Sequence, residues 1–293
     1  MNRDSRPLTA RAAGYIRAGL VFAIVSTFVG VVPRDAFTAG GGAWENHMAA
    51  ADEAYDRGDM PAAEASTQAA IDLSKDFEER DPRRTVARSH MADLQRVQGR
   101  YDQAREIYVA VLEDERRLYG PNHRFVAAAI ANLAKVYRDE GKFSEAERLY
   151  REVLAIRLAD PRPSRTLIAM SNNGLATILR AEGRYGEAEP LHRQALAEIE
   201  QVLGKEHTQV AYVLVDLAFL FYEQGRYADA EPLYRQALAI REKALDANHA
   251  DVAASLGYMA FVLSAQGKDA EADGYSRRAR QALANIPAAR RPN

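Results

Sequence analysis

Six glycines recur along this 293-residue chain with an almost constant spacing. They are Gly58, Gly99, Gly141, Gly183, Gly225 and Gly267, and their separations are 41, 42, 42, 42 and 42 residues. The surrounding sequence repeats with them, because alanine stands seven positions before and five positions after every one of these glycines. A fixed period of this length indicates repeated units that pack on their neighbours. The small alanine side chains predict that helices approach one another closely.

Each unit has the hydrophobic pattern of two helices joined by a turn. In the fifth unit, apolar residues between positions 210 and 221 recur three or four positions apart, which is typical of an α-helix. Gly225 then supplies the positive φ that ends a helix, and a second stripe follows. At the start of one second helix, Ser144 and Glu147 have the spacing of a capping box. Because strand alternation is missing, the units predict antiparallel helix pairs and not propeller blades.

The third unit resembles the tetratricopeptide repeat signature. The residues that carry the resemblance are Leu133, Ala134, Tyr137, Gly141, Phe143, Glu145, Ala146 and Tyr150. The long unit, with Gly-Pro-Asn-His at 120–123 and the segment 230–245, resembles the kinesin light chain variety. This resemblance covers residues 44–284. It implies an all-α, right-handed α-solenoid of about six antiparallel helix pairs, with a ligand groove lined by the first helix of each pair.

Three places depart from this pattern. The first unit has Met60 and Thr67 where aromatic residues recur, and the junction at 160–165 lacks the usual Gly-Pro-x-His. The last unit has polar Asp269 and Ser276 at positions that are aromatic elsewhere. Terminal repeats often become polar because one side faces water, so the final helix is predicted to be a cap.

Residues 1–40 have the composition of an export signal and not of a repeat. Four arginines and a single acid, Asp4, precede an uncharged run from Ala18 to Pro33, which predicts a separate N-terminal hydrophobic helix. As a helix, this run reaches about 24 Å, which is short of the roughly 30 Å of a bilayer core. A cleaved signal peptide and a retained single anchor both stay open, followed by a glycine-rich link. We expect export to the periplasm or cell envelope, with membrane contact only through this segment.

The composition excludes several functions. The chain has 39 basic and 41 acidic residues, so its net charge of −2 argues against binding to nucleic acid through bulk charge. It has no cysteine, which excludes disulfides and thiolate metal sites. The apolar content of 47% is sufficient for a packed core, which we place at residues 41–285, followed by a disordered tail at 286–293.

The predicted groove residues lie three or six positions before the turn glycines, on one face of the first helices. They are Arg96, Lys135, Arg138, Asn173, Thr177, Arg180, Phe219, Tyr222 and Phe261, where Asn173 joins the set four positions before Thr177. The groove would be cationic in its middle and aromatic toward the C-terminus. Arginines there suit an acidic side chain or a C-terminal carboxylate of a protein or peptide partner, and the aromatic residues suit an apolar anchor.

A purely structural interpretation of the same residues stays open. Arginines near helix C-termini complement the helix dipole and pair with neighbours such as Glu140 and Glu182. The aromatic residues also fit an inter-repeat core.

No motif predicts an enzyme, a cofactor or a metal site. His123, His207 and His249 recur at one loop position, which predicts a capping role and not three ligands of one metal. The carboxylates follow the repeat, whereas a catalytic site would break it. We therefore expect a non-catalytic interaction scaffold or adaptor. A self-associating structural protein (a homo-oligomer) and a non-catalytic subunit of an envelope enzyme complex stay as alternatives.

Overall fold

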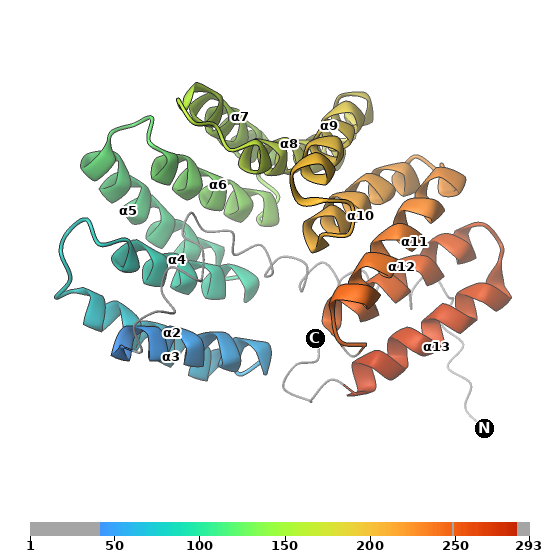
Figure 1. Cartoon of the computed structure of the whole chain (residues 1–293), viewed down its shortest axis with the longest axis horizontal. Helices are drawn as coiled ribbons and strands as arrows, with labels where there is room; N and C mark the ends of the chain where they lie inside the picture. The colour runs from blue at the N-terminus through green and yellow to red at the C-terminus, as the bar shows by residue number, and fades with distance from the viewer. Residues whose placement is uncertain (1–41, 248, 286–293) are drawn as a thin grey trace. The chain divides into compact units, whose positions relative to one another are not determined.

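A computed structural model describes residues 42–247 and 249–285, and every regular element in these ranges is an α-helix (Figure 1). The described helices fall into two compact units, one on each side of the bond between Glu182 and Gly183. The N-terminal unit contains α2 (Ala43–Asp56), α3 (Met60–Ser74), α4 (Pro82–Val97), α5 (Tyr101–Tyr119), α6 (Arg124–Asp139), α7 (Phe143–Ala159) and α8 (Arg165–Ala181). The C-terminal unit contains α9 (Tyr185–Leu203), α10 (Thr208–Glu223), α11 (Tyr227–Ala244), α12 (Ala250–Ala265) and α13 (Asp269–Asn285). Within each unit, every helix packs on the next one along the chain.

The turn glycines have one shared geometry. All six have φ between 74° and 82°, a left-handed conformation that side chains other than glycine rarely adopt. At five of these turns, the residue after the glycine donates its N–H to the carbonyl five positions earlier, as from Arg100 to Gln95 (2.9 Å) and from Lys142 to Tyr137 (2.8 Å). This bond satisfies a carbonyl that the helix end leaves open. The helix pairs predicted from the period are therefore confirmed.

The repeated alanines lie in the interior of the helix stacks. The alanines seven positions before the turn glycines are Ala51, Ala92, Ala134, Ala176, Ala218 and Ala260, and none is more than 6% exposed. Those five positions after the glycines are Ala63, Ala104, Ala146, Ala188, Ala230 and Ala272, and none is more than 1% exposed. A larger side chain at these places would push the helix axes apart, because interiors are close-packed.

The junctions between successive repeats are built from unlike pairs. In the N-terminal unit, the hydroxyl of Thr67 lies 2.9 Å from Nδ1 of His90, which belongs to the next repeat. At the equivalent place two repeats later, the ring of Tyr150 lies against Gly174. In the C-terminal unit, Tyr234 stacks on Tyr258 with ring centroids 5.3 Å apart. The turns are thus alike, whereas the junctions differ in size and chemistry.

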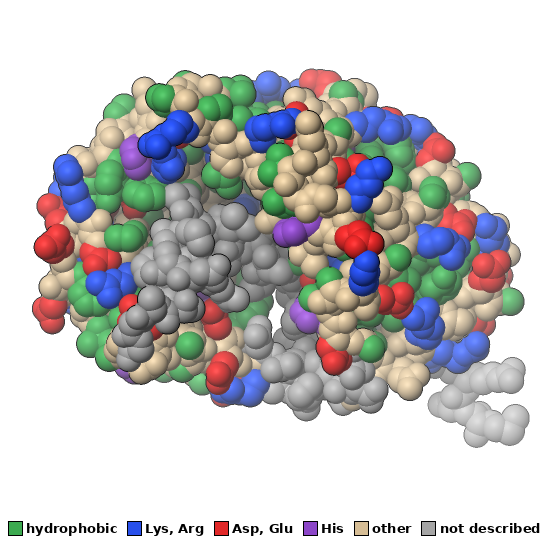
Figure 2. Space-filling model, in the orientation of Figure 1, with side chains coloured by type: hydrophobic (Ala, Val, Ile, Leu, Met, Phe, Trp, Pro, Cys, Tyr) green, Lys and Arg blue, Asp and Glu red, His purple; other side chains and the backbone are tan. Residues whose placement is uncertain are grey.

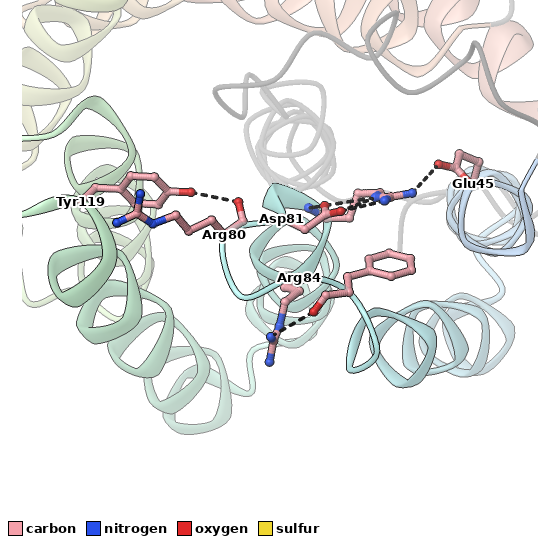
Figure 3. A network of polar contacts seen from close by, with 7 residues as sticks. Glu45, Arg80, Asp81, Arg84 and Tyr119 are labelled. Atoms are coloured by element: carbon pink, nitrogen blue, oxygen red, sulfur yellow. Dashed lines mark hydrogen bonds and ion pairs between the residues drawn. The ribbon is translucent and has the colours of Figure 1, made fainter.

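The long loops between repeats are fixed by polar contacts at the start of the following helix. Asp81 accepts the backbone N–H of Arg83 (2.9 Å), and the guanidinium of Arg83 also reaches Glu45 on α2 (3.3 Å) (Figure 3). At the other side of this loop, the hydroxyl of Tyr119 donates to the carbonyl of Arg80 (3.0 Å). The loop between α3 and α4 is therefore tied to α2 and α5.

The predicted capping box is wrong. Helix α7 begins at Phe143, and Lys142 is its N-cap without a side-chain hydrogen bond. Ser144 therefore lies inside the helix, and the carboxylate of Glu147 accepts hydrogen bonds from Arg151 (2.6 Å). The helix therefore begins two residues earlier than an N-cap at Ser144 would place it.

No helix in the described ranges is both long enough and apolar enough to cross a bilayer. The predicted export segment and the predicted tail lie outside the described residues.

Candidate functional site

Each unit contains one of two groups of predicted groove residues. Six of the nine lie on α4, α6 and α8 of the N-terminal unit, and three lie on α10 and α12 of the C-terminal unit. On the face shown in Figure 2, acidic and basic side chains are interspersed.

Arg96 is buried and its guanidinium is already held by carboxylates. Its Nε donates to Asp93 (3.1 Å) and its Nη1 to Asp139 on α6 (2.5 Å), and its side chain is only 2% exposed. Burial opposes the charge, but Asp93 and Asp139 outweigh it and raise the pKa of Arg96. Arg96 therefore joins α4 to α6 in the packing of the repeats, as the structural interpretation expected.

Lys135 is a half-buried cation whose hydrogen-bond partner is neutral. Its Nζ donates to the amide oxygen of Asn132 (3.1 Å). Burial lowers the pKa of Lys135 to about 8; the carboxylate of Asp93 opposes this effect, whereas the positive charges of Arg96, Arg138 and Arg157 add to it. A buried ammonium group in such surroundings would be stabilised by an additional anion.

Arg138 shares a carboxylate with Arg96. Its Nε and Nη2 lie 2.9 and 2.8 Å from the same oxygen of Asp139, and its side chain is 23% exposed. Burial raises the pKa of Asp139, but Arg138 and Arg96 outweigh this effect and lower it. One carboxylate therefore serves two guanidinium groups, which leaves Arg138 with unused donor capacity.

Arg157 on α7 was missed in the sequence. Its Nη1 donates to the carbonyl of Leu167 and to the hydroxyl of Ser171, both at 2.6 Å, and both acceptors are neutral. Burial lowers the pKa of Arg157 to about 10. The sequence signal was an arginine sixteen positions after a turn glycine, where Ile199 continues the apolar stripe of the next unit.

We call these residues the cationic cluster: Asp93, Arg96, Lys135, Arg138, Asp139 and Arg157. Four cations face two carboxylates, which leaves an excess of two positive charges in a partly buried place. Tyr150 lies in the same neighbourhood, since Arg138, Asp139 and Arg157 all act on its hydroxyl; burial is the main cause of its raised pKa. The cluster is chemically suited to an anion.

The other predicted residues of this unit lie on α8. Asn173 is buried, and its carbonyl accepts the hydroxyl proton of Thr177 (2.9 Å). Arg180 is half-buried in the last turn of the helix. A ligand role for these three residues stays a prediction.

The three aromatic residues that were predicted in the C-terminal unit lie next to one another. The rings of Tyr222 and Phe261 stack with centroids 4.1 Å apart, and Phe219 stacks on Tyr222 at 6.3 Å. The ring centroid of Tyr227 lies 5.1 Å from that of Tyr222, and we call these four residues the aromatic shelf. Burial, with a contribution from Tyr227, raises the pKa of Tyr222 to about 12, so this tyrosine stays neutral. All four residues are half-buried.

A second buried arginine repeats the geometry of Arg157 eighty-four residues later. Arg241 donates through Nη1 to Ser255 (2.8 Å) and to the carbonyl of Asp251 (3.3 Å). Its guanidinium also lies over the ring of Tyr212, 4.8 Å from the centroid. The same arginine–serine contact thus joins one repeat to the next in both units, but Arg241 is only 1% exposed.

The loop histidines have the predicted capping role. Nδ1 of His123, His207 and His249 accepts the backbone N–H two residues later at 3.3, 3.1 and 3.1 Å. In the described ranges, no group of three or more histidine and acidic side chains is arranged to hold a metal ion.

The repeats of this chain are similar to those of a known protein family. The family model described as Tetratricopeptide repeat matches residues 83–159, 167–243 and 214–285. Nothing among the curated proteins matches the sequence.

Several solved structures share the fold. BtubC (BKLC) from P. vanneervenii is similar with a TM-score of 0.63 and 22% identity over 78% of this chain and 92% of that chain. A Podosopora anserina protein described by its nearly identical kinesin light chain TPR-like repeats has a TM-score of 0.55 and 25% identity over 71% of this chain and 99% of its own. PilW, a type IV pilus biogenesis factor, has a TM-score of 0.54 and 19% identity over 85% and 96% of the two chains.

Proposed function

Because the chain belongs to the tetratricopeptide repeat family, we propose that it is a scaffold that binds segments of partner proteins on its first helices. This family is generally non-catalytic, and its relatives of the same fold bind protein partners. A surface built from stacked helices suits this role, because successive repeats present side chains at regular intervals to an extended segment.

The unbalanced charge of the cationic cluster carries the proposal. Lys135 and Arg157 are partly buried, yet their hydrogen bonds within the described residues go to neutral oxygens. An acidic side chain or a C-terminal carboxylate of the partner would supply the missing anion, with Lys135 and Arg138 as its direct donors. Such charge-assisted hydrogen bonds are about twice as strong as neutral ones. We assign Arg96 only a positioning role, because its carboxylate partners already occupy it.

The aromatic shelf supplies the second part of the proposal. Phe219, Tyr222 and Phe261 offer ring faces that are packed against one another and therefore lose little freedom when a ligand binds. Rigid aromatic surfaces of this kind are common anchors for apolar side chains. We propose that an apolar or aromatic residue of a partner packs there.

We further propose that the scaffold works in the periplasm or at another part of the cell envelope. The support is the sequence of residues 1–40, where arginines precede an uncharged run of sixteen residues. Fractionation of cells that express the tagged protein tests this location, because recovery in the cytosol with residues 1–40 uncleaved would contradict it.

A peptide array tests the binding function. The array would present 12-residue peptides in matched forms, with a free or amidated C-terminus, and with glutamate or glutamine at each position. We expect the bound peptides to be acidic or to require the free carboxylate, and Lys135→Met to weaken their binding about tenfold. Lys75→Met is the matched control, because Lys75 is an exposed lysine of the same unit whose only described partner is Asp72.

A second variant separates the two surfaces. Tyr222→Ala should weaken the binding of peptides that have an apolar anchor residue. It should leave the preference for acidic peptides or a free C-terminal carboxylate unchanged. If neutral and acidic peptides bind equally, or if Lys75→Met weakens binding as much as Lys135→Met, the cationic cluster is not the binding site.

A further inference from the structure

A separate groove of about 650 Å³ lies between α3 and α5, the second helices of the first two repeats. Residues of α4 also line it. It is therefore formed mainly by helices other than those that carry the proposed partner groove.

Gln95 lines this groove with an unsatisfied acceptor. The residue is 9% exposed, and its side-chain oxygen Oε1 is buried without a hydrogen-bond partner among the described residues. Its Nε2 reaches only the sulfur of Met91, at 3.4 Å. A buried acceptor without a donor costs about 1–3 kcal/mol, which a ligand that carries an N–H group would recover.

The sequence repeat shows that Gln95 is an exception. Four positions before the turn glycine, the next four repeats have Tyr137, Leu179, Phe221 and Leu263. These residues fill the same structural position with apolar or aromatic side chains. A polar side chain that breaks the repeat at the lining of a groove indicates a local function, since packing alone is satisfied by leucine.

The charge of the groove selects the kind of ligand. Glu64 and Glu106 line it, and none of its lining residues is a lysine or an arginine. Glu64 already accepts hydrogen bonds from Gln98 (2.7 Å) and Arg100. Glu106 is exposed and forms no ion pair with a described residue, so it is available to a cation. Met91 and Ile107 add apolar surface next to these polar groups.

We propose that this groove binds a basic side chain, lysine or arginine, of a partner protein. The aliphatic stem of that side chain packs on Met91 and Ile107, and its charged end donates to Oε1 of Gln95 beside the carboxylate of Glu106. The scaffold thus has a second docking surface on its second helices, which takes basic segments while the first helices take acidic ones.

Methionine methyl resonances test the proposal directly, because Met91 lines the groove. The full chain would be labelled with ¹³C at the methionine methyl groups, and the Met91 signal assigned with Met91→Leu. N-acetyl-lysine methylamide, N-acetyl-arginine methylamide and the uncharged N-acetyl-norleucine methylamide would then be added in turn. We expect a saturable shift of the Met91 signal with the basic probes only.

Three variants complete the experiment. Gln95→Leu adopts the residue of the fourth and sixth repeats, so it should fold normally and abolish the shift. Glu106→Gln should weaken binding several-fold, whereas Glu113→Gln, an exposed glutamate of the same helix outside the groove, should not. An equal response to norleucine, an unchanged response in Gln95→Leu, or no response to any probe would overturn the proposal. None of these results depends on Lys135 or Tyr222, so the first-helix groove is tested independently.

Discussion

Tyr150 and Gly174 form a contact that leaves no room for one additional carbon atom. A Cβ added to Gly174 would lie 2.4 Å from Cε1 of Tyr150 and 2.9 Å from its hydroxyl oxygen. The glycine on α8 thus permits the tyrosine on α7 to pack between two repeats. Tyr150 is also close enough to Arg138, Asp139 and Arg157 for their charges to act on its hydroxyl.

We expect Gly174→Ala to lower the free energy of unfolding by about 1–3 kcal/mol, because the tyrosine ring has to move. Chemical denaturation measures the change. Gly186→Ala is the control, since Gly186 lies on α9 with nothing within 4 Å of an added Cβ, and it should be neutral or slightly stabilising. In a Tyr150→Ala background the cost of Gly174→Ala should largely disappear, and full additivity of the two changes would contradict the contact.

Arg96→Ala should destabilise the N-terminal unit by about 3–5 kcal/mol, because it leaves the carboxylate of Asp93 without its ion-pair partner and that of Asp139 with Arg138 alone. Thermal unfolding measures this loss. Adding Asp93→Asn should recover part of the stability, since it removes the carboxylate that Arg96→Ala leaves without an ion-pair partner. If Arg96→Ala unfolds like the wild type but fails to bind partners, Arg96 is a ligand-binding residue and not a structural one.

Lys135→Met should increase the stability of the fold and weaken the binding of acidic ligands. Burial lowers the pKa of Lys135 to about 8 from the ordinary 10.5, so the folded state disfavours the charged form. The cost is fully present below pH 8 and disappears as the pH rises from 8 to 10.5, so the wild type should gain stability over this window. We expect the variant to be about 1–3 kcal/mol more stable at pH 7 and to lack this rise.

Binding of an acidic peptide should also raise the pKa of Lys135 and take up a proton near pH 8–9. Calorimetry in buffers of different ionisation enthalpy measures the uptake. Proton uptake that persists in Lys135→Met would show that another group is responsible.

His123 should make stability depend on pH. Its Nδ1 must be unprotonated to accept the N–H of Phe125, and burial, with the charge of Arg124, lowers the pKa of His123 below 6.5. Its contribution is therefore present above pH 6.5 and is lost as the pH falls from 6.5 through the lower folded-state pKa. His123→Asn keeps a capping side chain that does not titrate in this range. Unfolding curves between pH 7 and pH 5 should show a smaller loss for the variant, by up to about 1 kcal/mol, and identical losses would contradict this role.

The repeated parts of the fold were predictable because they depend on local requirements. A positive φ demands glycine at the turns, and close helix packing demands alanine beside them, so both are visible as a period. The capping histidines were predictable for the same reason, because each acts on a backbone N–H only two residues away. The pairing of Phe219 with Tyr222 followed from helical spacing, since the two residues share one helix face, whereas Tyr227 of the aromatic shelf was not predicted.

The residues that differ from the prediction depend on contacts between segments that are far apart in the sequence. Arg96 was expected at an open surface, but its partner Asp139 lies 43 residues away and encloses it. Arg157 lies on a second helix, outside the face from which the groove was predicted, and its acceptors belong to the next repeat. The unmet acceptor of Gln95 is likewise visible only once α3, α4 and α5 are assembled.

Because the residue pairs at the junctions differ, the side chains favour one order of the repeats. Threonine with histidine, tyrosine with glycine, and tyrosine with tyrosine each fit their own counterpart and clash with, or leave a gap against, the others. Exchanging two repeats would preserve every turn and every buried alanine, but the side chains at the junctions between repeats would no longer fit one another. At these three junctions the side chains therefore restrict which repeat can follow which.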